Sequence, residues 1–166
     1  MFHIMRISII IGAKGKLMSS ATGEMGQRVR ARLEASAYRY TAGRARVVRL
    51  IEATRGPRSA SDLHASMRDG VPLSSLYRTL TILSETGVVV RTHGADGVAL
   101  YEPAEWLRGH HHHLVCVDCR TVEDVAVDSG DESLLAALAD RVAASQGYAA
   151  RGHRIDVEGI CRRCAA

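Results

Sequence analysis

Hydrophobic residues recur at helical spacing through most of the N-terminal half of the chain, with polar residues between them. The periodic stretches predict three helices at residues 24–37, 44–54 and 60–68, and a fourth between Pro72 and Gly87. Ser59 followed by Asp62 is a capping-box pattern and predicts the start of the third helix. Gly87 lies just after the expected end of the fourth helix, a position at which glycine is common.

The residue types change after the fourth helix. Residues 88–90 and 98–101 are rich in valine and aromatic or aliphatic side chains, and a glycine-containing turn at 94–97 lies between them, which predicts a β-hairpin. Short helices followed by a hairpin are typical of a winged helix-turn-helix, in which the last helix enters the major groove of DNA. Leucines occupy one face of that helix, and the other face carries Ser74, Tyr77, Arg78 and Thr81.

A second unit follows the hairpin. Its pattern predicts strands at residues 110–115, 121–127 and 153–157, and a helix at residues 131–146. We interpret it as a small α+β module, joined to the winged helix by a hinge. The expected fold class is therefore α+β, with a poorly ordered extension, a winged-helix domain, a hinge and a second domain at residues 1–22, 23–102, 103–109 and 110–166.

Composition adds little to this picture. The chain has 166 residues, of which 46% are hydrophobic, so a packed core is expected. Lys and Arg number 22 against 18 Asp and Glu, a net charge of +4 that permits a nucleic-acid partner without requiring one. The apolar run at residues 7–11 is too short to span a bilayer, so we expect a cytoplasmic protein with no membrane partner.

The four cysteines fall into two C-x2-C pairs, and each pair has the spacing of metal ligands. They are Cys116, Cys119, Cys161 and Cys164. Four thiolates satisfy tetrahedral Zn²⁺, whereas four unrelated core thiols would rarely show two such spacings. We expect a structural zinc ion that stabilises the second domain.

Four consecutive histidines, His110, His111, His112 and His113, stand directly before the first cysteine pair. Neighbouring side chains on a strand point to opposite faces, so alternate histidines should face two different sites. Possible further ligands are His93, Glu102, Glu105, Glu123, Asp124, Asp131, Glu132 and His153. The alternative for each carboxylate is an ordinary surface charge.

Candidate DNA contacts lie on the fourth helix and on arginines near the first two helices. Arginines supply the phosphate contacts that determine affinity, and Arg39 and Arg44 are placed to do so. On the helix, Arg78 is suited to guanine and Tyr77 to a thymine methyl group, with Ser74 beside them. The alternative is a solvent-exposed helix face without a partner.

Three strings together resemble the ferric uptake regulator family, the metal-responsive transcriptional regulators of bacteria. They are Leu76–Leu80 (LYRTL), His110–Cys119 (HHHHLVCVDC) and Cys161–Cys164 (CRRC). The resemblance runs from about Gln27 to Cys164, and the all-histidine run is most like the zinc uptake regulators. It implies a homodimer with a C-terminal dimerisation domain, binding an operator in double-stranded DNA, with no small-molecule substrate and no catalytic step.

The resemblance also implies roles for single residues. The four cysteines match the structural zinc ligands, Arg39 matches a minor-groove contact, and Tyr77 and Arg78 match the base-reading pair. The regulatory site would take Glu102, His111, His113 and Asp124, and a second site would take His110, His112 and His153, with Glu132 as a substitute glutamate.

The chain departs from the family pattern in the regulatory site. Pro57 stands where the iron and peroxide sensors have a histidine, and Val90 stands where zinc sensors have an aspartate. We expect His93 to fill the missing position, which would make the site bridge the hairpin, the hinge and the next strand. The regulatory metal, Zn²⁺ or Fe²⁺, stays open because nitrogen and oxygen ligands accept both.

The favoured hypothesis is a metal-loaded repressor that controls zinc or iron homeostasis. Its alternatives are a peroxide- or nickel-responsive regulator of the same family, and a zinc-containing interaction module that does not bind DNA. A zinc hydrolase is disfavoured because the chain has no H-E-x-x-H pattern.

Overall fold

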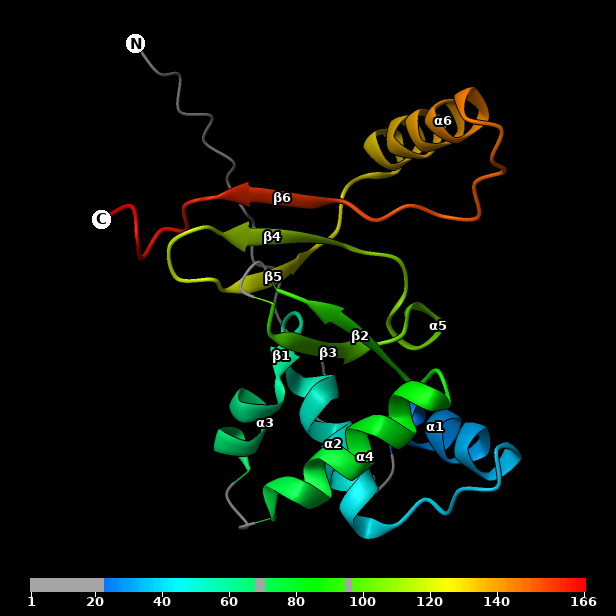
Figure 1. Ribbon diagram of the computed structural model, residues 1–166, viewed down its shortest axis with the longest axis vertical. Coiled ribbons are helices and arrows are strands. Elements are labelled where there is room, and N and C mark those ends of the chain that lie inside the picture. The colour runs from blue at the N-terminus through cyan, green and yellow to red at the C-terminus, as the bar shows by residue number, and fades with distance from the viewer. Residues whose placement is uncertain (1–22, 68–70, 95–96) are drawn as a thin grey trace.

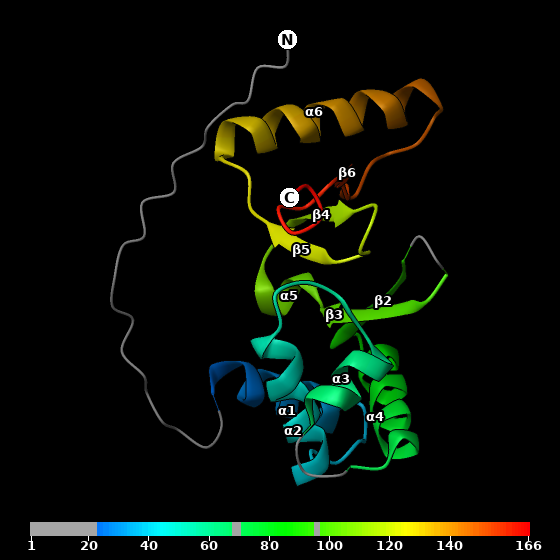
Figure 2. The ribbon, with the colours of Figure 1, turned by 90° about the vertical axis from the view of Figure 1, so that its left-hand side faces the viewer.

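The computed structural model describes residues 23–67, 71–94 and 97–166, so the predicted N-terminal extension and the end of the third predicted helix, Arg68, lie outside it. Figure 1 shows two layers of structure stacked along the long axis. The lower one is a helical domain with a small sheet, and the upper one is a second sheet with a long helix on its far side (Figures 1 and 2). This is the α+β arrangement expected from the sequence.

The lower domain is a winged helix. Its elements are α1 (Glu24–Ala35), α2 (Ala42–Ala53), β1 (Arg58–Ser59), α3 (Ala60–Ser66), α4 (Leu73–Glu85), β2 (Val89–His93) and β3 (Ala99–Pro103). The four helices and the hairpin were predicted, and the capping box of Ser59 and Asp62 is present at the start of α3. The two-residue strand β1, which pairs with β3, was missed because it is too short to show alternation.

Leucines form most of the core of this domain. Leu33, Leu63, Leu76, Leu80 and Leu83 are each no more than 1% exposed. Three of them come from α4, where their spacing places them on one side of the helix and leaves the polar side in solvent. Burial of each leucine contributes about 1.5–3 kcal/mol to folding, so the core holds α4 in a fixed orientation.

The predicted hinge contains a helical turn, α5 (Glu105–Arg108). Trp106 Nε1 donates a hydrogen bond of 2.6 Å to the carbonyl oxygen of Gly87, at the end of α4. The guanidinium of Arg28 lies 5.2 Å from the Trp106 ring centroid, a cation–π contact with α1. The connection is therefore tied to the winged helix by side-chain contacts.

The upper domain contains β4 (His112–Cys116), β5 (Val122–Val125), α6 (Ser129–Ser145) and β6 (Asp156–Gly159). The strand order is β5-β4-β6, with β4 antiparallel to β5 and parallel to β6. The observed β4 and β6 begin two and three residues later than predicted, so His110, His111 and His153 lie just before their strands. No helix in the described residues is long and apolar enough to cross a membrane.

Helix α6 begins where Asp128 accepts hydrogen bonds from the backbone amides of Gly130 and Asp131. The helix contains no buried residue, and its hydrophobic side chains Leu134, Leu138 and Val142 are 70%, 48% and 58% exposed. A helix with an uncovered apolar stripe of this kind provides a surface for association.

Candidate metal centres and DNA-binding face

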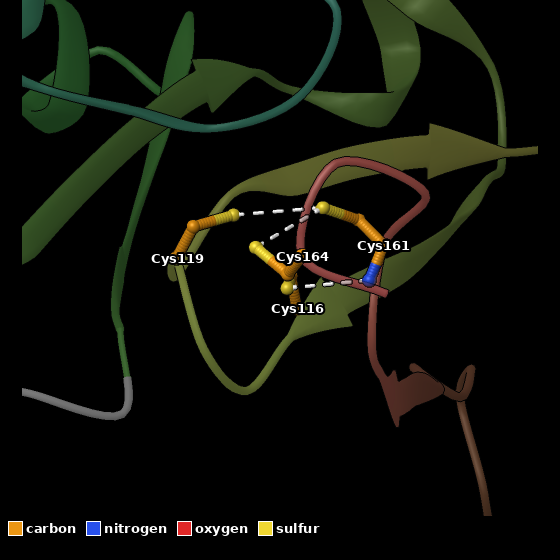
Figure 3. A group of neighbouring side chains, drawn as sticks. All are labelled: Cys116, Cys119, Cys161 and Cys164. Atoms are coloured by element: carbon orange, nitrogen blue, oxygen red, sulfur yellow. Dashed lines mark hydrogen bonds between the residues drawn. The ribbon is translucent and has the colours of Figure 1, made fainter. Parts of the chain in front are cut away.

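The four cysteines meet at one edge of the upper sheet (Figure 3), with their Sγ atoms all within 4.8 Å of one another. Cys116 ends β4, Cys119 lies in the turn that follows, and Cys161 and Cys164 follow β6. Because β4 and β6 are parallel neighbours, their carboxyl ends come out side by side. Sγ of Cys161 lies 3.7 Å from Sγ of Cys119 and 3.7 Å from Sγ of Cys164, so the thiols are free.

The surroundings of the cluster shift the pKa values of two of its thiols in opposite directions. Contact with the Thr121 hydroxyl, and then with the Thr121 backbone, lowers the pKa of Cys119 to about 6. The Cys119 thiol beside it raises the pKa of Cys164 to about 12. Four sulfur donors from two C-x2-C pairs at this spacing fit a tetrahedral Zn²⁺ ion. The ion would replace these thiol contacts with metal–thiolate bonds.

A second group of possible ligands joins the two domains. Glu102 lies on β3, His113 lies on β4, and His111 is the residue just before β4. Asp124 lies on β5, and the ligand atoms of the four residues are within 4.8 Å of one another. Nε2 of His111 and Nε2 of His113 lie 3.1 and 3.0 Å from Oε2 of Glu102. His113 and Asp124 are direct partners in the β4–β5 register. We call this group the interdomain cluster.

Burial and charge make the interdomain cluster suited to a cation. Glu102 is 1% exposed, and burial raises its pKa, but hydrogen bonds from His113 and His111 outweigh burial and hold its pKa below the usual value. The bond to Glu102 in turn raises the pKa of His113. Oδ1 of Asp124 is buried, has no hydrogen-bond partner among the described residues, and lies 3.8 Å from Nε2 of each histidine. Two nitrogens and two carboxylates fit a divalent metal ion.

The third group, which we call the histidine group, contains His110, His112, Glu132 and His153, and its ligand atoms again lie within 4.8 Å of one another. Oε2 of Glu132 lies 2.9 Å from Nε2 of His112, and Oε1 lies 3.0 Å from Nε2 of His153. Nε2 of His110 is 3.3 Å from the same Oε1. Glu132, in the first turn of α6, therefore occupies the place of the expected glutamate. The alternating histidines divide between the two groups as strand geometry predicts.

His93 is not brought into the interdomain cluster, which corrects the prediction from the sequence. In the β2–β3 register, His93 pairs with Ala99, whereas Glu102 pairs with Val90. Three residues of strand separate the two positions, roughly 10 Å at 3.3 Å per residue. The other four residues predicted for the site, Asp124 among them, do come together.

The polar face of α4 is exposed, as predicted. Ser74, Tyr77 and Arg78 are in solvent, with Tyr77 49% exposed. Arg39 is also exposed, in the loop between α1 and α2. Arg44 is half-buried and its Nη1 donates to the carbonyl oxygen of Arg39, which restrains that loop.

Two arginines at the interdomain cluster were missed. Arg108 Nη1 donates a 2.6 Å hydrogen bond to Oδ2 of Asp124, and Arg154 Nη2 donates a 3.1 Å hydrogen bond to Oε1 of Glu102. Each is a single arginine in a connecting segment, and no pattern in the sequence distinguishes it from a surface residue.

A winged helix with an exposed polar recognition helix, joined through a cluster of metal-ligand residues to a second domain with a four-cysteine site, defines the class of metal-sensing DNA-binding regulators. The family model described as the ferric uptake regulator family matches residues 35–158. The chain belongs to this family, whose members are dimeric transcription regulators that bind DNA in response to metals.

Individual relatives agree with this assignment. The chain is 32% identical to the ferric uptake regulation protein of Bacillus subtilis over 142 residues, covering 82% of this chain and 92% of the relative. It is 33% identical to the zinc uptake regulation protein of Mycobacterium tuberculosis over 135 residues, covering 80% and 98%. The solved structure of the Helicobacter pylori ferric uptake regulator has the same fold, with a TM-score of 0.68, 19% identity, and coverage of 92% of this chain and 98% of that one.

Proposed function

We propose that this chain is a repressor that binds a palindromic operator as a homodimer when the interdomain cluster is loaded with a divalent metal ion. The observation that supports it is the origin of the ligands, since Glu102 comes from the winged helix and the other three residues come from the second domain. A metal held by all four restricts one domain relative to the other.

In a homodimer, this restriction sets the distance between the two α4 helices. That distance must match the separation of two half-sites on DNA, about 34–36 Å for adjacent turns. A coupling free energy of 1–3 kcal/mol between metal and DNA would change DNA affinity about 5- to 150-fold. The site thus acts as a switch, and the proposal includes no catalytic step.

The uncovered stripe of α6 supports the homodimer. Leu134, Leu138 and Val142 recur at four-residue spacing and are exposed in the single chain. Val157 on β6, which is 52% exposed, and its register partner Leu114 on β4, which is 45% exposed, extend the apolar surface on the upper sheet. Association of two copies through this domain removes these side chains from water.

The residue assignments follow from the three groups. We propose that the four cysteines hold a structural Zn²⁺ and that the histidine group with Glu132 holds a second metal within the dimerisation domain. Ser74, Tyr77 and Arg78 would read bases while Arg39 and Arg44 serve the backbone. The regulatory ion is Zn²⁺ or Fe²⁺, since the mixed nitrogen and oxygen ligands bind both and cellular availability decides. The proposed location is the cytoplasm.

The test compares the two faces of the histidine run. DNA affinity is measured against buffered Zn²⁺ and Fe²⁺ for the wild type, His111→Ala and His112→Ala, on a duplex selected by the wild type from a random-sequence library. His111→Ala should stay a folded, zinc-containing dimer and lose the metal dependence, whereas His112→Ala should weaken the response only. If His112→Ala abolishes the response and His111→Ala leaves it intact, the switch has been assigned to the wrong cluster.

A further inference from the structure

We propose that Arg108 is a positioning residue that transmits the state of the regulatory metal site to helix α2 of the winged helix. The proposal rests on the proposed function of the interdomain cluster and adds the route by which it reaches the DNA-binding domain. Arg108 is the last residue of α5, in the connection between the domains.

The guanidinium of Arg108 contacts both domains at once. Nη1 donates to Oδ2 of Asp124 at 2.6 Å, and the two side chains are 18% and 20% exposed. Nη2 lies within hydrogen-bond distance of three carbonyl oxygens at the end of α2, those of Ile51, Glu52 and Thr54, at 3.2, 3.3 and 2.9 Å.

The chemistry of these contacts explains why an arginine is needed. The last carbonyl groups of a helix lack intrahelical donors and carry a partial negative charge. A guanidinium has several donors in a rigid plane, so it serves a carboxylate and these carbonyls together. Lysine carries the same charge at one point, and it cannot span both partners in this geometry.

The carboxylate of Asp124 divides its two oxygens between metal site and arginine. Oδ2 accepts from Arg108, whereas Oδ1 has no hydrogen-bond partner among the described residues and lies beside His111 and His113. A metal that binds Oδ1 reorients a carboxylate whose other oxygen holds Arg108. The position of the guanidinium, and with it the end of α2, therefore depends on the occupancy of the site.

A second contact keeps the end of α2 against the same strand. Gly56 has φ +98°, and a Cβ atom there would lie 2.4 Å from the carbonyl oxygen of Val122 on β5. Arg58 Nη1 also donates to that oxygen, at 3.3 Å. Val122 and Asp124 are two residues apart and so lie on one face of β5. Since residues 54–59 lead directly into α3, movement of β5 relative to α2 shifts the helices that carry the recognition face.

The experiment uses the full-length dimer and the variants Arg108→Gln, Arg108→Lys and Arg151→Gln. Arg151 is the matched control, because it is exposed and has no hydrogen bond or ion pair within the described part of the chain. For each protein, three quantities are measured: Zn²⁺ affinity by chelator competition, the ratio of DNA affinities with and without Zn²⁺, and amide hydrogen exchange of residues 51–54. The DNA is the duplex selected by the wild type.

We expect Arg108→Gln to keep Zn²⁺ affinity within about tenfold of the wild type, the lower end of what loss of an outer partner costs. The DNA affinity ratio should fall at least fivefold, and Zn²⁺ should no longer slow exchange at the end of α2. Arg108→Lys should behave like Arg108→Gln, and Arg151→Gln like the wild type.

An unchanged DNA affinity ratio in Zn²⁺-loaded Arg108→Gln would overturn the proposal. A full ratio in Arg108→Lys would overturn it as well, because positive charge alone would then suffice. Should Arg108→Gln not fold, the lysine variant decides by the same ratio. If the DNA affinity of the wild type itself does not change with Zn²⁺, the proposed function is contradicted instead. The two failures are therefore distinguishable.

Discussion

Replacing Cys161 by serine should unfold the C-terminal domain and leave the winged helix folded. Among the described residues beyond position 109, the buried hydrophobic side chains are Cys116 and Val122, whereas the winged helix has a core of leucines and valines. Burial of Val122 contributes about 1.5–3 kcal/mol. A four-cysteine Zn²⁺ site contributes roughly 10 kcal/mol or more. The metal is therefore the main stabilising element of the domain until two copies associate.

The assay combines zinc content, gel filtration and amide hydrogen exchange by mass spectrometry. Cys161→Ser should contain less zinc and elute as a monomer, because the proposed association surface consists of α6 and the upper sheet. Its exchange should become fast throughout β4, β5 and β6 and stay slow in α4. Arg162→Ser is the control, since it changes an exposed residue between Cys161 and Cys164 without removing a sulfur ligand.

A dimeric Cys161→Ser protein with protected β4 and β6 would refute this reasoning. It would mean that contacts between the two chains, rather than the metal, hold the sheet together. Rapid exchange of α4 together with β4 would contradict the second part, the independence of the winged-helix core.

Four further outcomes are expected. Arg78→Ala should cost about 1–3 kcal/mol of DNA binding and relax base preference in a competition assay, whereas Arg39→Ala should weaken binding to all sequences and reduce its salt dependence. Leu80→Ala should destabilise the winged helix by about 2–5 kcal/mol in urea unfolding, because the side chain is fully buried. Glu132→Gln should lower the metal affinity of the histidine group in chelator competition and, like His112→Ala, weaken the metal dependence of DNA binding without abolishing it, because that group lies within the dimerisation domain.

Local patterns predicted most elements of the fold. The leucine stripe of α4 and the capping box of α3 are short-range features, and both appear in the structure as expected. Strand β1 and the helical turn α5 were not predicted. Each covers only about one period of its own pattern, two residues for β1 and four for α5, which is too few to show a repeat. Each owes its conformation to partners distant in sequence, β3 for the strand and Gly87 for Trp106.

The metal-ligand groups also divide into features that local patterns predict and features that depend on residues distant in sequence. Strand alternation separated His111 and His113 from His110 and His112, because that separation depends only on backbone geometry. The remaining ligands depend on which strands lie side by side. The register of β2 with β3 separates His93 from Glu102, whereas the pairing of β4 with β5 places Asp124, which the family resemblance implied, beside His113.

Spacings of a few residues encode the winged helix, the α+β second domain, the paired cysteines and the two faces of the histidine run, so all four could be predicted from the sequence. The link that Arg108 makes between Asp124 and the end of α2 appears only in the folded chain. These contacts join residues 16 to 57 positions apart. They depend on the packing of one domain against the other, which local spacing does not specify.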